Sequence, residues 1–235
     1  MFASNRNPFA ERLTPENSAV LLIDHQVGLF SFLPSVNALT LKNNILGLAK
    51  TAKHLGLPTI LTTSWPHGPN GPTMPELVEL FPDNLIIDRN TVNFWDHPPS
   101  VEAVRKLGRK KLIIAALDTT TCLAMAAVYG VQAGYDVYAV VDASSTFDSL
   151  NEQAAMLRMA SAGVVVTTWV PVLAELCKDT TINGKYIAGL LTEHTGTYYA
   201  AMNNYLATGK TADAVRPHIA ETVPAAGRTT RYRYA

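Results

Sequence analysis

The sequence predicts a three-layer α/β/α fold with a mainly parallel central sheet. Short aliphatic and β-branched runs alternate along the chain with longer segments of helical spacing, which is the rhythm of βαβ units. The runs are apolar on both faces, as expected for strands that helices cover on each side. A length of 235 residues allows one large domain with a substantial core.

Each strand is expected where an apolar run is short and ends in turn residues. In chain order these runs are residues 19–23, 59–63, 85–87, 112–117, 137–141 and 163–169. The run at 85–87 is the weakest of these patterns, because it has only three residues.

Helices are expected in the connections between the strands. Residues 37–55 carry apolar side chains at near-helical spacing and are followed by Gly56 and Pro58, an ordinary stop signal. A further helix is expected at about residues 151–162, before the last strand. Residues 66–83 hold five prolines and two glycines, which predicts a long loop suited to binding.

The chain is expected to have three parts: an N-terminal arm at 1–17, a main domain at 18–177, and a C-terminal helical extension and tail at 178–235. The extension is expected to pack on the domain or in an oligomer interface. Its last stretch, 227–235, combines three arginines with two tyrosines and is expected to be an exposed arm or an oligomer contact.

Composition excludes several classes of partner. The 19 basic and 19 acidic residues cancel, so no overall field attracts nucleic acid or an anionic membrane. No apolar stretch has the length of a membrane helix, and the N-terminus lacks the pattern of a signal peptide. The expected partners are a small-molecule substrate and further copies of the chain, and the expected location is the cytoplasm.

Two cysteines occur, which is too few for a disulfide framework and is consistent with a reducing compartment. Cys177 shares a helical face with Leu173 and is expected in the core. Cys122 follows the apolar run at 112–117, where a helix is expected to start at the cysteine. A helix N-terminus lowers the pKa of a thiol and supplies N–H groups for an oxyanion, although for a lone cysteine a small buried side chain is the more common role.

Ligands of parallel sheets bind at the carboxyl ends of the strands, so polar residues there are candidates for a site. Asp24 ends the first strand, and Ser64 and Trp65 follow the second. Asp24 is a candidate base for Cys122, because burial beside the thiol would raise its pKa, although capping of a turn is the alternative. Asp142 also ends a strand, and its turn-forming neighbours favour a structural role.

Arg89 follows the weak third strand and precedes Phe94 and Trp95. It is a candidate cation that faces the site and balances a thiolate. A surface ion pair with Asp88 is the alternative. Trp65, Phe94 and Trp95 are candidates for the pocket wall or, alternatively, core or interface aromatics.

These residues resemble the motifs of the isochorismatase-like cysteine hydrolases. The Asp-x-Gln motif of that family matches Asp24-His25-Gln26, and its Thr-x-x-Cys loop matches residues 119–122. The resemblance covers roughly residues 18–175. Within the family the chain is similar to the YcaC-type hydrolases, through residues 22–26, 60–64, 68–72 and 141–144.

The resemblance implies a catalytic triad of Asp24, Arg89 and Cys122, with arginine where many members have lysine. It also implies an oxyanion loop of Asp118, Thr119 and Thr121, in which the N–H groups of Thr121 and Cys122 hold the oxyanion and a cis peptide falls at Asp118-Thr119. It points to a homo-oligomer and suggests an octamer. Candidate substrate-binding residues are Gln26, Phe30, Trp65, Asn93, Phe94 and Trp95.

No cofactor or metal is expected. Nicotinamidases of the family bind zinc through an Asp-x-His motif, and here His67 lacks an aspartate two residues earlier. His25 and His97 are likewise isolated. The expected function is metal-independent hydrolysis of an amide-type C–N bond through a thioester. The alternatives are enol ether hydrolysis of the isochorismatase type and a non-catalytic binding or thiol-reactive protein.

Overall fold

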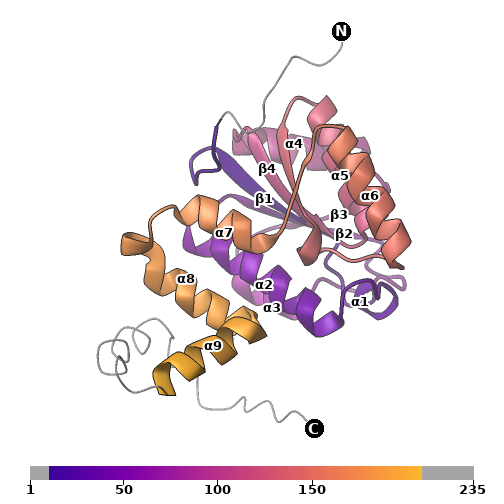
Figure 1. Cartoon of the computed structure of the whole chain (residues 1–235). Coiled ribbons are helices and arrows are strands. Elements are labelled where there is room, and N and C mark those ends of the chain that lie inside the picture. Colours follow the sequence, from indigo (N-terminus) through magenta and orange to yellow (C-terminus); the bar gives the residue numbers. More distant parts are fainter. Residues whose placement is uncertain (1–10, 208–235) are drawn as a thin grey trace. The chain divides into compact units, whose positions relative to one another are not determined.

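The computed structural model describes residues 11–207, and over that range it confirms the three-layer α/β/α architecture (Figure 1). The sheet has six parallel strands in the order β3-β2-β1-β4-β5-β6. All six lie at or within a residue or two of the predicted runs: β1 (Ser18–Ile23), β2 (Thr59–Ser64), β3 (Ile86–Arg89), β4 (Lys111–Ala116), β5 (Asp136–Val140) and β6 (Val165–Thr167).

Helices in the crossovers cover the two faces of this sheet. The helices α2 (Ala38–His54), α3 (Pro75–Leu80) and α7 (Trp169–Cys177) lie on one face (Figure 1). The helices α4 (Pro98–Leu107), α5 (Ala124–Gln132) and α6 (Ser149–Ser161) lie on the other. A short helix, α1 (Leu29–Phe32), follows β1. Strands β1 and β4 are buried at every position, as predicted for strands covered on both sides.

The strand order reverses direction at the centre of the sheet. From β1 the chain builds outward through β2 to β3, and it then returns to β4 on the other side of β1 and continues to β6. Ligand crevices of open α/β sheets form at the carboxyl ends of the strands where the order reverses. The crevice expected here lies beyond the ends of β1 and β4, where Asp24 and Cys122 follow.

Two predicted segments differ from the structure. The loop expected at 66–83 contains α3, in which Pro75 occupies the first turn and Glu76 is the acidic residue near the N-terminus. Proline is compatible with that position because its missing N–H would have no helical partner there. The strand expected at 163–169 is shorter, because Trp169 already begins α7 and its N–H donates to Asp142 Oδ1 at 3.0 Å. Asp142 therefore has the structural role that was favoured.

The chain divides into two compact units, residues 1–176 and 177–235. In the first, the predicted arm is described from residue 11 and places Leu13 in the core, with no exposed surface. The second contains α8 (Thr180–His194) and α9 (Gly196–Ala207). The arginine- and tyrosine-rich stretch at 227–235 lies outside the described residues. No helix within residues 11–207 combines the length and the hydropathy needed to cross a bilayer.

Candidate active site

Asp24 lies immediately after β1 in a left-handed backbone conformation, with φ of 58°. Aspartate is among the residues that tolerate this region. Its N–H donates to Thr62 O at 3.1 Å, so the turn is held to the neighbouring strand β2. The side chain is fully buried, and it also accepts a hydrogen bond from Thr62 Oγ1 at 2.8 Å. Asp24 is therefore held rigidly at the crevice.

Cys122 lies in a π-helical turn, Thr119–Leu123, between β4 and α5. The Leu123 N–H donates to Asp118 O at 2.9 Å, five residues earlier, and regular α-helix begins only at Ala124. The helix predicted to start at the cysteine thus starts two residues later. Cys122 is half-buried.

Arg89 is the last residue of β3 and is 2% exposed. Its Nη2 pairs with Asp24 Oδ2 and lies 3.8 Å from Cys122 Sγ, while Nη1 donates to Val92 O at 2.9 Å and also to Thr91 O. The alternative of a surface pair with Asp88 is wrong. Asp88 is exposed and accepts a hydrogen bond from Thr63 Oγ1 at 3.1 Å.

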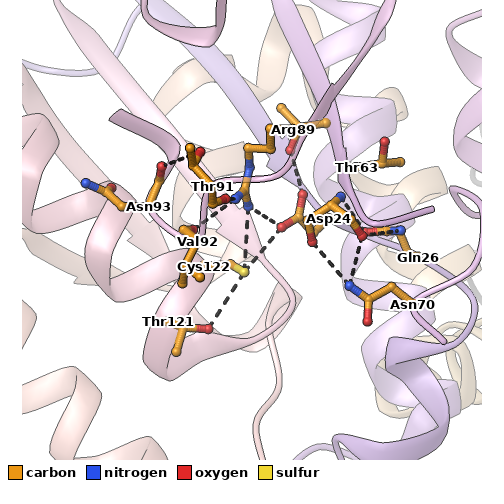
Figure 2. A network of polar contacts seen from close by, with 12 residues as sticks. Asp24, Gln26, Thr63, Asn70, Arg89, Thr91, Val92, Asn93, Thr121 and Cys122 are labelled. Carbon is orange, nitrogen blue, oxygen red and sulfur yellow. Dashed lines mark hydrogen bonds and ion pairs between the residues drawn. The ribbon is translucent and has the colours of Figure 1, made fainter. Parts of the chain in front are cut away.

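The structure brings Asp24, Arg89 and Cys122 together from three different strand ends (Figure 2). Cys122 Sγ lies 3.2 Å from Asp24 Oδ2, as donor to the carboxylate. Arg89 contacts both, so one carboxylate oxygen faces a thiol and a guanidinium. A nucleophile and a base in hydrogen-bond contact, with a cation beside both, are the parts required for thiol-based covalent catalysis.

The pKa values of the pair favour a protonated thiol. Burial and, to a smaller extent, the charge of Asp24 together raise the pKa of Cys122 to about 12, while Arg89 opposes the change. The lowering predicted from a helix N-terminus is therefore overruled, because desolvation of the thiolate outweighs it. Burial also raises the pKa of Asp24, against the opposing effects of Arg89 and Thr62. A thiol with such a raised pKa needs a base before it can act as a nucleophile.

The loop before Cys122 is organised by Asp118. Its Oδ1 accepts hydrogen bonds from the N–H groups of Thr120 and of Thr121, the latter at 3.1 Å. The Thr119 N–H donates to Ser145 O at 2.8 Å. Of the expected oxyanion donors, the Thr121 N–H is thus already engaged, because the Asp118 side chain caps this turn. The cis peptide is Leu117-Asp118, one bond earlier than the resemblance implied.

Both the oxygen and the nitrogen of the Gln26 side-chain amide form hydrogen bonds with the protein backbone. Its Oε1 accepts from Ser64 N at 2.9 Å, and its Nε2 donates to Ser64 O at 3.1 Å and to Gly71 O. Asn70 Nδ2 donates to the same Ser64 carbonyl at 2.8 Å (Figure 2). Gln26 therefore fastens the loop that follows β2 to the end of β1. It was expected to contact substrate, and its geometry is that of a loop anchor.

The remaining predicted pocket residues fall into different environments. Phe94 is buried in the core, Asn93 caps the turn Phe94–Asp96 by accepting from Trp95 N at 3.2 Å, and Trp95 donates through Nε1 to Ala126 O at 2.7 Å. Those two aromatics therefore pack as core residues. Phe30 is half-buried in α1. Trp65 is 61% exposed beyond the end of β2 and is free to contact a ligand.

The three histidines considered from the sequence, His25, His67 and His97, have different surroundings. His25 is fully buried, with Nε2 at 3.1 Å from Ala143 O, and burial lowers its pKa to about 4. His97 Nδ1 lies 2.9 Å from Ser100 Oγ, and His67 is exposed in the loop after β2. Among residues 11–207, no three His, Cys, Asp or Glu side chains are grouped so that they could hold a metal ion.

Sequence reasoning missed Thr62 and Asn70 as partners of the site, and it singled out Ser64 only as a polar residue at the end of its strand. Thr62 contacts Asp24 directly, and Asn70 and Gln26 both contact Ser64. The available signal was the polar triplet Thr62-Thr63-Ser64 at the end of an otherwise aliphatic strand, beside the strand that ends in Asp24.

Comparisons with known proteins identify the family of the chain. The model of the isochorismatase domain matches residues 18–170. The Escherichia coli (strain K12) protein named "Probable hydrolase YcaC" is 42% identical over 195 residues, which cover 83% of this chain and 94% of that protein. Isochorismatase domain-containing protein 2 of Rattus norvegicus is 28% identical over 172 residues, covering 72% and 77%.

Solved structures give the same grouping. The YcaC gene product of Escherichia coli, described as an octameric hydrolase of unknown specificity, superposes with a TM-score of 0.81 at 41% identity and covers 85% of this chain and 98% of its own. YcaC from Pseudomonas aeruginosa, solved with hexane-2,5-diol and covalent acrylamide, has a TM-score of 0.81 at 39% identity, with 83% and 98% covered. The chain belongs to the isochorismatase family and, within it, is similar to the YcaC hydrolases.

Proposed function

We propose that the protein is a metal-independent cysteine hydrolase that cleaves an amide-type C–N bond of a small molecule through a thioester. The observation that carries this proposal is the 3.2 Å contact between Cys122 Sγ and Asp24 Oδ2. Because Asp24 is fully buried, water does not compete with the thiol for this oxygen from bulk solvent. The pair supplies the nucleophile and the base within one hydrogen bond.

In the first half of the reaction, Asp24 Oδ2 takes the thiol proton as Cys122 Sγ attacks the carbonyl carbon. The carbonyl π electrons move to oxygen, and the Cys122 N–H is the remaining candidate among the expected donors for this oxyanion. When the tetrahedral intermediate collapses, the C–N bond breaks. Ammonia or an amine leaves with the proton from Asp24, and a thioester on Cys122 remains.

In the second half, Asp24 is again a carboxylate and takes a proton from water as the oxygen of that water attacks the thioester. Collapse breaks the C–S bond, the carboxylic acid product is released, and the proton on Asp24 returns to Cys122. Arg89 does not exchange protons, because guanidinium stays charged at any working pH. It holds Asp24 in place and stabilises negative charge as it moves between oxygen and sulfur.

The covalent acrylamide in the Pseudomonas aeruginosa relative favours a small amide or an electrophile of similar size as a ligand. Acrylamide combines a primary amide with an electrophilic alkene, so it suits a site that contains a reactive thiol. Trp65 is the exposed aromatic nearest in sequence to the end of β2 and is our candidate for a contact with the substrate.

The proposal is tested by ammonia release from a panel of small aliphatic and aromatic carboxamides, with a chelator present throughout. Wild-type protein, Cys122→Ala and Cys177→Ala are compared. Cys177 is the matched control because it is the other cysteine of the chain and is buried in α7. Activity that survives chelation and Cys177→Ala but disappears in Cys122→Ala supports the proposal. Full activity in Cys122→Ala would contradict it and direct attention to ether cleavage.

We further propose that the chain works as a homo-oligomer in the cytoplasm, with the octamer of the Escherichia coli relative as the expected assembly. Native mass spectrometry measures the number of copies directly. A monomer at all accessible concentrations would contradict this part of the proposal.

A further inference from the structure

The two oxygens of Asp24 have different partners. Oδ2 faces Arg89 and Cys122, whereas Oδ1 accepts the hydroxyl of Thr62 at 2.8 Å. Thr62 is 1% exposed and lies on β2, beside Ile23 in the register of the sheet. It also accepts the Asp24 N–H through its own carbonyl at 3.1 Å. Thr62 therefore holds both the backbone and the side chain of Asp24.

The donor at Oδ1 restricts where Asp24 can carry a proton. A threonine hydroxyl has one hydrogen, and this hydrogen is directed at Oδ1. A proton on Oδ1 would make that oxygen a poorer acceptor and would weaken the buried hydrogen bond from Thr62. A proton on Oδ2 leaves the contact with Thr62 unchanged, and Oδ2 is the oxygen that touches the thiol.

We propose that Thr62 is a positioning residue that keeps the mobile proton of the site on the Oδ2 oxygen of Asp24. This inference rests on the proposed thiol mechanism, and it gives a role to a residue to which neither the resemblance nor the predicted triad assigned one. Threonine suits the role because its β-branched side chain has few rotamers in a strand. The hydroxyl also lowers the pKa of Asp24, against the larger effect of burial.

The strand offers a matched control. Thr63 is the next residue, is 4% exposed, and donates its hydroxyl to Asp88 Oδ1 at 3.1 Å. Successive strand residues point to opposite faces, so Thr63 makes the same kind of hydrogen bond away from Asp24. Thr63→Val removes a hydroxyl from the same strand without touching the thiol, the carboxylate or Arg89.

The experiment measures how fast iodoacetamide alkylates Cys122 as a function of pH, with the modified peptide quantified by mass spectrometry. In this reaction the S–C bond forms, iodide leaves with the C–I electrons, and Asp24 takes the thiol proton. The acid limb of the profile therefore reports the ionisation of Asp24. It needs no amide hydrolysis, so it distinguishes failure of this inference from failure of the proposed function. The same variants are also compared in the pH profile of kcat/KM for any amide that is turned over.

For Thr62→Val we expect the acid limb to move up by about one pH unit, because a hydrogen bond to the carboxylate is lost. At a fixed pH on this limb, alkylation of Cys122 should then be about tenfold slower in Thr62→Val than in the wild type. Thr62→Ser should restore the wild-type profile, and Thr63→Val should leave it unchanged. Thr62→Ala repeats the deletion if the valine variant does not fold. An acid limb in the Thr62 deletion that coincides with that of Thr63→Val, or no restoration by serine, would overturn the inference.

Discussion

In the proposed mechanism Asp24 is the base for Cys122, and its negative charge also opposes ionisation of the thiol. The substitution Asp24→Asn separates these two effects. Asparagine has the same shape and also tolerates the left-handed backbone at this position. It removes the base, which we expect to lower kcat for an amide by about 10²- to 10⁴-fold, the usual contribution of a general base. We expect the upper part of this range, because Asp24 is buried and, among the described residues, no other side chain accepts a hydrogen bond from the thiol and could replace the lost base.

The same substitution should make the thiol more acidic. A carboxylate at 3.2 Å from sulfur opposes its ionisation by roughly 5 kcal/mol at an effective dielectric of about 20. Arg89 offsets part of this, so we expect the pKa of Cys122 to fall by at least about one unit. Thiolate ultraviolet absorbance and alkylation rate, followed on the alkaline side, measure this change.

Asp88→Asn is the matched control for this substitution, because Asp88 is adjacent to Arg89 but exposed and directed to Thr63. It should change neither the kcat nor the pKa of the thiol. Loss of turnover together with a more acidic thiol is the predicted combination for Asp24→Asn. Wild-type turnover in that variant, or a thiol that becomes less acidic, would refute the reasoning about the pair.

Three further substitutions test the surroundings of the site. Arg89→Lys keeps the positive charge, but a lysine cannot contact Asp24, Cys122 and the carbonyls of Thr91 and Val92 at the same time. The free energy of unfolding in urea should therefore fall by about 1–3 kcal/mol. An unchanged free energy would contradict this. Gly28→Ala would bring a methyl group against Pro69 O and to 2.8 Å from Asn70 O, so the melting temperature should fall. In the control Gly184→Ala, inside α8, the new methyl group would lie 3.6 Å from Thr180 Cβ, so this change should be neutral or stabilising. Burial raises the pKa of Asp142 to about 6. Between about pH 4 and pH 6 the carboxyl of Asp142 therefore stays protonated in the folded protein but is ionised in the unfolded chain. The free energy of unfolding consequently falls as the pH rises through this range. Asp142→Asn should be more stable than wild type near neutral pH and equal to it near about pH 4, and a difference independent of pH would count against this assignment.

Much of the fold could be predicted because the strands are continuous aliphatic runs and the helices between them have clear periodicity. The helix α3 was missed because its first residue, Pro75, belongs to a proline-rich stretch that is typical of loops. A proline-rich sequence is compatible both with a loop and with the first turn of a helix, so composition alone does not distinguish the two.

The candidate site was predictable where a reactive or charged residue lies at the carboxyl end of a strand or in the turn after it, as Asp24, Arg89 and Cys122 do. What each side chain contacts depends on which strands are neighbours, and that order is not a local property of the sequence. The pairing of Arg89 with Asp24, the contact from Thr62 and the engagement of Gln26 with Ser64 all depend on the register of β2 beside β1 and β3. The acidity of Cys122 was predicted in the wrong direction because burial was not visible in the motif.

The most direct test of the central claim is intact-protein and peptide mass spectrometry of the enzyme quenched during turnover of an amide. The thioester mechanism predicts a mass increase equal to the acyl group, the amide minus ammonia, on the peptide that contains Cys122, and its absence in Cys122→Ala. Turnover with no such adduct under conditions where hydrolysis of the thioester limits the rate, or an adduct on another residue, would contradict a thioester on Cys122.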